Sequence, residues 1–278
     1  MQALSRRKLK LATQDINISL AQREYIKNYL INRRRITIFQ YAIFILLIIV
    51  WEVGAYIGFI DSFIFSSPSR VIRSAIDMAK DGTLFYHVGI TMLETLVSFT
   101  FVNIFGIAIA ILLWWNDNVS KVMEPYLVVL NSLPKSALAP VFIVWLGNNM
   151  KTIIIAAISV SVFGTIITLY TNFKEVEEDK VKLIRTLGGT KKDVLWRVVL
   201  PSNIPSMISL MKVNIGLSLV GVIIGEFLAA KAGLGYLIIY GSQVFKLDWV
   251  ILSITILCVL ATILYKFLGV MEKKYCAK

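Results

Sequence analysis

Charged residues are scarce in this sequence of 278 residues, of which 17% are charged and 57% are hydrophobic. Soluble domains carry roughly 25% charged residues. Apolar runs of about 20 residues recur, each long enough to cross a ~30 Å hydrocarbon core as a helix. Backbone polar groups in lipid must be satisfied within helices or closed barrels, which excludes an aqueous catalytic fold. The runs are continuously apolar rather than alternating, so the sequence predicts an all-α, polytopic membrane bundle.

The apolar runs predict six transmembrane helices within one membrane domain, residues 36–278. The expected spans are Ile36–Ile57, Val88–Trp115, Val122–Trp145, Thr152–Tyr170, Met207–Ala230 and Trp249–Val270. Residues 1–35 form a basic extension before the first span, and this polar start argues against a secretory signal. Gly221 and Gly225 form a GxxxG pair in the fifth span, a spacing that permits close packing within the bundle or at a dimer seam.

Histidine and cysteine are nearly absent, with one His and two Cys in the chain. Metal sites in helical bundles usually need several His or carboxylate ligands on facing helices. We therefore expect His87 to be an interfacial residue, with no metal or other cofactor bound. The sequence also offers no evident nucleophile–base pair for a membrane enzyme. Cys258 and Cys276 fall at different depths, in the last span and in the tail, so no disulfide is expected.

The net charge of +12 is explained by topology rather than by nucleic acid. Most Lys and Arg lie in the amino-terminal extension, in the loop after the fourth span and in the carboxyl tail. These segments share one side of the bilayer when both termini are cytoplasmic, as the positive-inside rule requires. The sequence thus predicts a multi-pass protein of the cell membrane, with the lipid bilayer and not nucleic acid as its partner.

The loop of residues 174–205 is too long and too ordered to be a simple connection. Its first part has acids at the start, bases at the end and apolar residues at helical spacing, which predicts a helix. Gly188-Gly189 then provides a stop, and Thr190 is placed to cap a second helix. Pro201 and Pro205 are expected to end this second helix and to redirect the chain into the fifth span. The pattern predicts a stiff helix–turn–helix with a basic edge.

The segment LIRTLGGTKKDVLWRVVLPSNIP resembles the cytoplasmic signature loop of permease subunits of binding-protein-dependent ABC importers. The family pattern is Glu-Ala-Ala, three residues, Gly, nine residues, Ile, one residue, Leu-Pro. Gly188 matches the glycine and Leu200-Pro201 match the end, with Val198 in place of isoleucine. The start departs from the pattern, because Lys182, Leu183 and Ile184 occupy the Glu-Ala-Ala positions. The segments FSSPSRVI, NSLPKSALAPVFIVWLG and GEFLAAKAGLGYLI are similar to the nitrate/sulfonate/taurine-type branch.

This resemblance implies a type I ABC importer permease fold that acts without hydrolysing ATP. It implies a homodimer with a second permease copy, a cytoplasmic ATPase dimer that uses the ATP, and an extracellular solute-binding protein. The residues implied to couple to the ATPase are Lys182, Leu183, Ile184, Arg185, Gly188, Gly189, Val198, Leu200 and Pro201. Gly188-Gly189-Thr190-Lys191 lacks the spacing of a phosphate-binding loop, so no ATP site is expected on this chain.

Ionisable residues inside spans are costly and invite a functional hypothesis. Five qualify by position: Glu52, Glu94, Lys135, Lys212 and Glu226. Around Lys135, Asn131, Ser132 and Ser136 predict a polar pathway through a third span broken by Pro134 and Pro140. The alternative is that residues 122–132 lie along the membrane surface. For Glu226 the alternatives are a gate and a packing partner near the outer face.

The transported solute is expected to be a nitrate-, sulfonate- or taurine-like anion, because Lys135 would favour negative charge. A vitamin precursor, either a thiamine pyrimidine or riboflavin, is the alternative within the same class of importer. The alternative from another class is an ion-coupled secondary transporter, which would show paired discontinuous spans.

Overall fold

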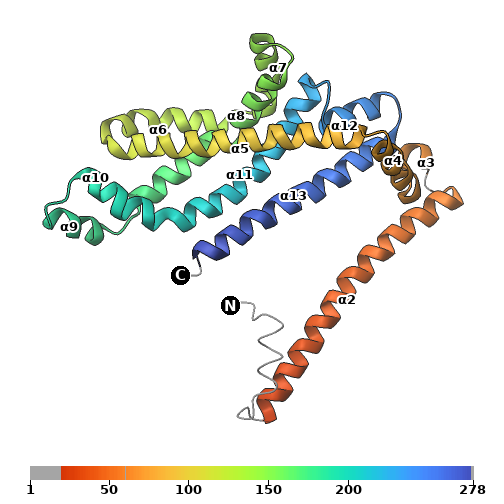
Figure 1. Ribbon diagram of the computed structural model, residues 1–278, viewed down its shortest axis with the longest axis horizontal. Helices are drawn as coiled ribbons and strands as arrows, with labels where there is room; N and C mark the ends of the chain where they lie inside the picture. Colours follow the sequence, from red (N-terminus) through yellow and green to blue (C-terminus); the bar gives the residue numbers. More distant parts are fainter. Residues whose placement is uncertain (1–19, 60, 277–278) are drawn as a thin grey trace. The chain divides into compact units, whose positions relative to one another are not determined.

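The computed structural model describes residues 20–59 and 61–276, and all regular structure in these ranges is helical (Figure 1). Residues 1–19 of the basic extension lie outside the described residues, and so does the side chain of Cys276. The helices are α2 (Leu20–Ile57), α3 (Ser62–Phe65), α4 (Pro68–Lys80), α5 (Thr83–Trp115), α6 (Asp117–Ser132), α7 (Lys135–Leu146), α8 (Met150–Lys174), α9 (Glu178–Thr186), α10 (Lys191–Val194), the π-helical segment η1 (Leu195–Val199), α11 (Leu200–Ala229), α12 (Leu234–Gln243) and α13 (Leu247–Cys276).

The chain forms two compact units, residues 1–69 and 70–278. In the first unit, α2 continues through Arg33, Arg34 and Arg35 without a break, so the helix begins before the first predicted span. Glu52, one of the acids expected within a span, accepts a hydrogen bond from the backbone N–H of Ser69 at 3.0 Å. This carboxylate therefore satisfies one of the N–H groups that the first turn of α4 leaves unpaired.

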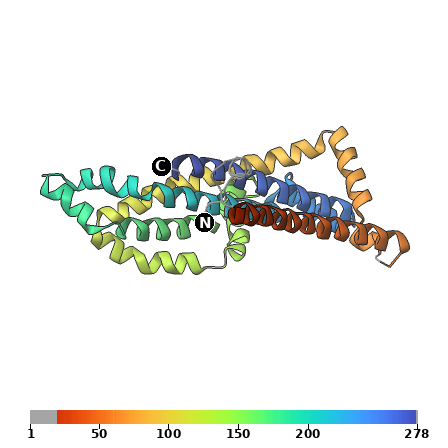
Figure 2. The ribbon, with the colours of Figure 1, turned by 90° about the horizontal axis from the view of Figure 1, so that it is seen from below.

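In the second unit, α8 packs against both α5 and α11, and these three helices form the centre of the bundle (Figures 1 and 2). A Cβ atom on Gly221 would lie 2.7 Å from Ala157 Cα, and one on Gly225 would lie 2.9 Å from Ile153 Cγ2. The GxxxG pair of α11 therefore faces α8, as a close helix approach requires. Beside these contacts, α12 and α13 pack with Met78 of α4 in a second apolar cluster.

The third predicted span is not one helix. Among the described residues, five helices are long and apolar enough to cross a membrane, and there is a sixth crossing if α6 and α7 are counted together. These two helices meet at an angle of 94°, with Leu133 and Pro134 between them. Pro134 produces the break because the residue before a proline is pushed out of the helical region. The expectation of a second break at Pro140 is wrong, since Pro140 lies inside α7.

The prediction that Pro201 and Pro205 end a helix is also wrong. α10, η1 and α11 form one continuous helix from Lys191 to Ala229, with both prolines inside it. The N–H of Leu200 donates to the Leu195 carbonyl, five residues back, so the helix is widened just before Pro201. A π-turn of this kind relieves the clash between a proline ring and the carbonyl four residues before it.

The α8–α11 contact predicts unequal effects of two substitutions in the same helix. Gly221→Val should lower the thermal unfolding midpoint of the detergent-purified protein, because overpacking costs about 1–3 kcal/mol. Gly216→Val is the matched control, since no atom lies within 4 Å of a Cβ built at Gly216. Equal midpoints for the two variants would contradict the packing described here.

Candidate functional site

The turn between α9 and α10 has the geometry that its sequence predicts. Gly188 has a φ angle of +82°, a left-handed conformation that glycine adopts at little cost. The N–H of Gly188 donates to the Arg185 carbonyl and that of Gly189 to the Ile184 carbonyl, both at 2.9 Å. These bonds satisfy the last carbonyls of α9. The stop at Gly188-Gly189 is therefore confirmed.

The start of α10 is held by a capping box. The Asp193 N–H donates to Thr190 Oγ1 at 3.4 Å, and the Thr190 N–H donates to Asp193 Oδ2 at 2.9 Å. Such reciprocal bonds satisfy two orphan donors of a helix start. The predicted cap at Thr190 is confirmed, and both sides of the turn are fixed by local hydrogen bonds.

One face of this helical pair is buried and the other is exposed. Val194, Leu195 and Val199 are buried in the core formed with α5 and α8, and Val181 and Ile184 of α9 pack against that core. The exposed apolar residues are Leu183, Leu187 and Trp196, at 60%, 75% and 63% exposure. We call the helical pair of α9 and α10, with the first turn after α10, the hairpin. Its hairpin face consists of Leu183, Arg185, Leu187, Trp196 and Arg197. Sequence reasoning missed Trp196, whose signal was a large aromatic residue off the apolar stripe of Val194, Leu195, Val198 and Val199.

The residues assigned to the coupling loop do not all share this face. Lys182, Leu183, Arg185, Gly188 and Pro201 are exposed, whereas Ile184, Gly189 and Leu200 are half-buried and Val198 is buried. Lys182, which stands where the family pattern has an acid, forms an ion pair with Glu178 at 3.0 Å one helical turn away. Its charge is thus balanced on its own helix. An exposed pair of this kind adds at most about 1 kcal/mol.

The hairpin is joined to the bundle by Lys191. Its Nζ donates to the Trp115 carbonyl at 2.8 Å and lies 5.5 Å from the Trp114 ring centroid. A cation at the carboxyl end of α5 is favoured by the helix dipole. The hairpin is therefore bonded to α5 as well as continuous with α11.

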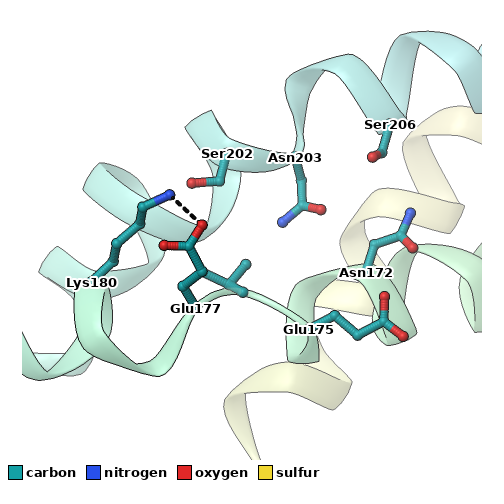
Figure 3. A pocket seen from close by; sticks show the side chains of 8 residues that line it. Asn172, Glu175, Glu177, Lys180, Ser202, Asn203 and Ser206 are labelled. Carbon is teal, nitrogen blue, oxygen red and sulfur yellow. Dashed lines mark hydrogen bonds and ion pairs between the residues drawn. The ribbon is translucent and has the colours of Figure 1, made fainter.

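A polar cavity of about 280 Å³ lies where α8, α9 and α11 meet (Figure 3). Two of its charged members, Glu177 and Lys180, form an ion pair at 2.9 Å, the dashed line in Figure 3. Asn203 donates to the Val199 carbonyl at 2.8 Å, just before Pro201. The other polar side chains that line the cavity are Asn172, Glu175, Ser202 and Ser206. The cavity places hydrogen-bonding groups along the widened, proline-containing part of the α10–α11 helix.

The candidate pathway residues fall into two separate groups. Asn131, Ser132, Lys135 and Ser136 surround the α6–α7 bend, where the Lys135 Nζ donates to the Asn131 carbonyl and Ser132 donates to the Val128 carbonyl. Lys135 is half-buried and its three neighbours are exposed. These two hydrogen bonds are local ones that cap the bend.

Glu226 lies instead among α5, α11 and α12, where it is 1% exposed. It accepts from Thr91 Oγ1 at 2.6 Å and from the Gly235 N–H at 2.5 Å. Glu94 of α5 is equally buried. The prediction listed both acids but missed Thr91. The only signal was that Glu94 comes early in the second predicted span and Glu226 late in the fifth, which brings both to the same side of the predicted bundle.

Residues 102–271 match the family described as "Binding-protein-dependent transport system inner membrane component", so the chain belongs to that family of ABC importer permease subunits. It is 28% identical to the formylaminopyrimidine transport permease protein of Halalkalibacterium halodurans, over 69% of this chain and 76% of that one. It is 22% identical to the taurine transport system permease protein of Escherichia coli, over 82% and 85%.

A solved structure of the MetNI methionine ABC transporter, in an inward-facing conformation, has the same fold. Its TM-score is 0.60 at 16% identity, covering 68% of this chain and 94% of that one. The expected type I importer permease fold is thus confirmed. The family match favours an ABC importer over the ion-coupled secondary transporter that the sequence left as an alternative.

Proposed function

We propose that this permease acts as a homodimer in which the hairpin face docks on a cytoplasmic ATPase dimer. The observation that supports docking most directly is the combination of a rigid turn with an exposed apolar and basic surface. The turn is fixed by the Gly188 conformation and by the Thr190–Asp193 capping box. Leu187 and Trp196 expose apolar area beside Arg185 and Arg197. Aromatic residues and arginine are enriched in protein interfaces, so the composition of this surface resembles that of an interface.

The mechanical role follows from the stiffness of the hairpin. ATP binds and is hydrolysed on the partner subunits, whose closure would push the hairpin. A capped helix pair bonded to α5 through Lys191 passes such a displacement to the bundle, whereas a flexible loop would absorb it. The bundle then changes between two packings, biased by ATP at one end and by a loaded binding protein at the other.

This role assigns the orientation. The hairpin and both termini would lie in the cytoplasm, as the basic charge distribution predicts. The α12 end of the bundle would then face the extracellular solute-binding protein. Glu226 belongs to that outer end, and the α6–α7 bend lies between the two surfaces.

We assign a small sulfonate- or taurine-like anion as the solute. The taurine transport permease supports this choice, because it aligns with 82% of the chain. A pyrimidine precursor is the second candidate, supported by the 28% identity to the formylaminopyrimidine permease. Selection between them would rest largely on the binding protein that delivers the solute.

Gly188→Val should uncouple transport from ATP hydrolysis, because a β-branched residue is strained at a φ of +82°. We expect a loss of ATP-dependent uptake of roughly tenfold or more in proteoliposomes, with membrane insertion unchanged. Gly188→Asn is the control, since asparagine tolerates the left-handed conformation and should retain most activity. Normal uptake by the valine variant would argue against a coupling role for this turn.

Co-purification tests the partners. The permease should retain an ATPase in mild detergent, and a cysteine introduced at Leu187 should crosslink to that ATPase. A cysteine at Ser242, exposed on α12, is the control and should not crosslink to it. Crosslinking from Ser242 alone would reverse the proposed orientation, and solute transport without any ATPase would refute the importer mechanism.

Lys135→Ala should reduce the uptake of an anionic solute several-fold if the α6–α7 bend lines the pathway, while ATPase assembly stays unchanged. Taurine and formylaminopyrimidine, each supplied with the binding protein encoded with this permease, should be compared in the same proteoliposomes. Unaltered uptake in the variant would favour a surface position for the bend, and uptake of the pyrimidine alone would replace the anion assignment.

A further inference from the structure

Three membrane-spanning helices end at one cavity. α5 ends at Trp115, α8 ends at Lys174, and the continuous helix of α10, η1 and α11 begins at Lys191. A cavity of about 460 Å³, which we call the basic cavity, is lined by residues of these helices and of α9. The 25 residues of α8 span roughly 38 Å, which exceeds the ~30 Å hydrocarbon core. The basic cavity therefore lies where the helices leave the hydrocarbon, at the depth of the lipid headgroups.

The charge that lines the basic cavity is positive. Lys182 is balanced by Glu178, at 3.0 Å on the same helix. The remaining charged residues of the lining are Lys174, Arg185, Lys191 and Asp117. Three cations thus face one acid, which leaves a net charge of two positive units. The cavity therefore favours an anion.

Aromatic side chains place two of these cations. Lys191 Nζ lies 5.5 Å from the Trp114 ring centroid, and Lys174 Nζ lies 5.1 Å from the Tyr170 ring centroid. Lys191 donates to the Trp115 carbonyl at 2.8 Å. An ammonium group has three donors, so this bond leaves Lys191 with two more for an acceptor in the cavity.

The Tyr170 hydroxyl is an independent sign of a ligand. Tyr170 lines the basic cavity and is only 8% exposed, yet its Oη atom has no hydrogen-bond partner among the described residues. A buried tyrosine hydroxyl usually finds a partner, because leaving it unpaired loses the hydrogen bonds it would make with water. An oxygen acceptor in the cavity would satisfy this hydroxyl beside the Lys174 ammonium.

The surroundings of the cavity favour a lipid headgroup over a soluble phosphate ion. Trp114 and Trp115 contact each other at the end of α5, the position where tryptophan is enriched at membrane interfaces. Leu112, one turn before Trp115, is 64% exposed, and Trp115 itself is 44% exposed. An acyl chain attached to a headgroup in the cavity thus has apolar surface of α5 along which to lie. A free phosphate ion makes no use of that surface.

We propose that the basic cavity binds the headgroup of an anionic phospholipid from the adjoining leaflet, whose phosphate oxygens accept from Lys174, Lys191 and Tyr170. Basic pockets between membrane helices bind such headgroups. Phosphatidylglycerol brings one negative charge, whereas the choline of phosphatidylcholine adds a cation that the net positive charge of the cavity repels. The bound headgroup joins the ends of α5 and α8 to the start of α10, and so holds the base of the hairpin.

Nanodiscs of two compositions test this site in the complete transporter, one of phosphatidylcholine alone and one of equal parts phosphatidylcholine and phosphatidylglycerol. Tyr170→Phe removes only the hydroxyl. In phosphatidylcholine alone this variant should unfold at the wild-type temperature or above it, because the hydroxyl has no partner to lose. With phosphatidylglycerol present it should unfold below the wild type. Tyr126→Phe, at an exposed tyrosine of α6 outside the cavity, is the matched control and should follow the wild type in both lipids.

Native mass spectrometry of transporter released from the mixed nanodiscs measures the bound lipid directly. The wild type should retain phosphatidylglycerol in preference to phosphatidylcholine. Lys174→Ala should weaken this retention about fivefold, the contribution of one lysine at an anionic membrane surface. Lys192→Ala is the control, since Lys192 is exposed on α10 but does not line the cavity.

Equal retention of the two lipids by the wild type would overturn the inference. So would equal losses in Lys174→Ala and Lys192→Ala, because the attraction would then belong to the whole basic surface. Stabilisation of the wild type by inorganic phosphate in phosphatidylcholine nanodiscs would assign the cavity to a soluble anion instead. Retention that appears only after the ATPase has been removed would assign it to the ATPase interface. The same measurements on the permease alone need no solute, ATP or hairpin docking, so their outcome is separate from that of the proposed function.

Discussion

The close approach of α8 to α5 and α11 is the constraint on which the rest of the structure depends. Lipid offers no hydrophobic driving force between helices, so the bundle relies on van der Waals contact and interhelical hydrogen bonds. Gly221 and Gly225 bring α11 onto α8, and Gly106 brings α5 onto Thr165 of α8. Thr165 donates to Asn214, and Asn214 donates to Asn103, which links all three helices inside the core. The helices that carry the hairpin at one end of the bundle and Glu226 at the other are thereby packed around one centre.

The continuous helix from Lys191 to Ala229 joins these ends. At 1.5 Å per residue its 39 residues span roughly 58 Å. The capped α10 begins this helix, and Glu226 lies one turn before its end. The π-turn before Pro201 is the part where this helix departs from regular α-helical geometry, and the polar cavity lies beside it. A displacement of the hairpin therefore bends this segment or reaches Glu226 directly.

Much of this could be predicted from local sequence. Gly188-Gly189 and Thr190 act through bonds within five residues, so their roles follow from residue type, and the apolar runs give most spans. Pro201 failed as a helix terminator because its clash is relieved by a π-turn, which no residue pattern announces. Pro134 breaks its helix while Pro140 does not, although the local sequences look alike. The bond from Thr91 to Glu226 depends on the relative depth and rotation of two helices, which periodicity does not supply. Lys182 departs from the family pattern, yet Glu178 balances its charge one turn away.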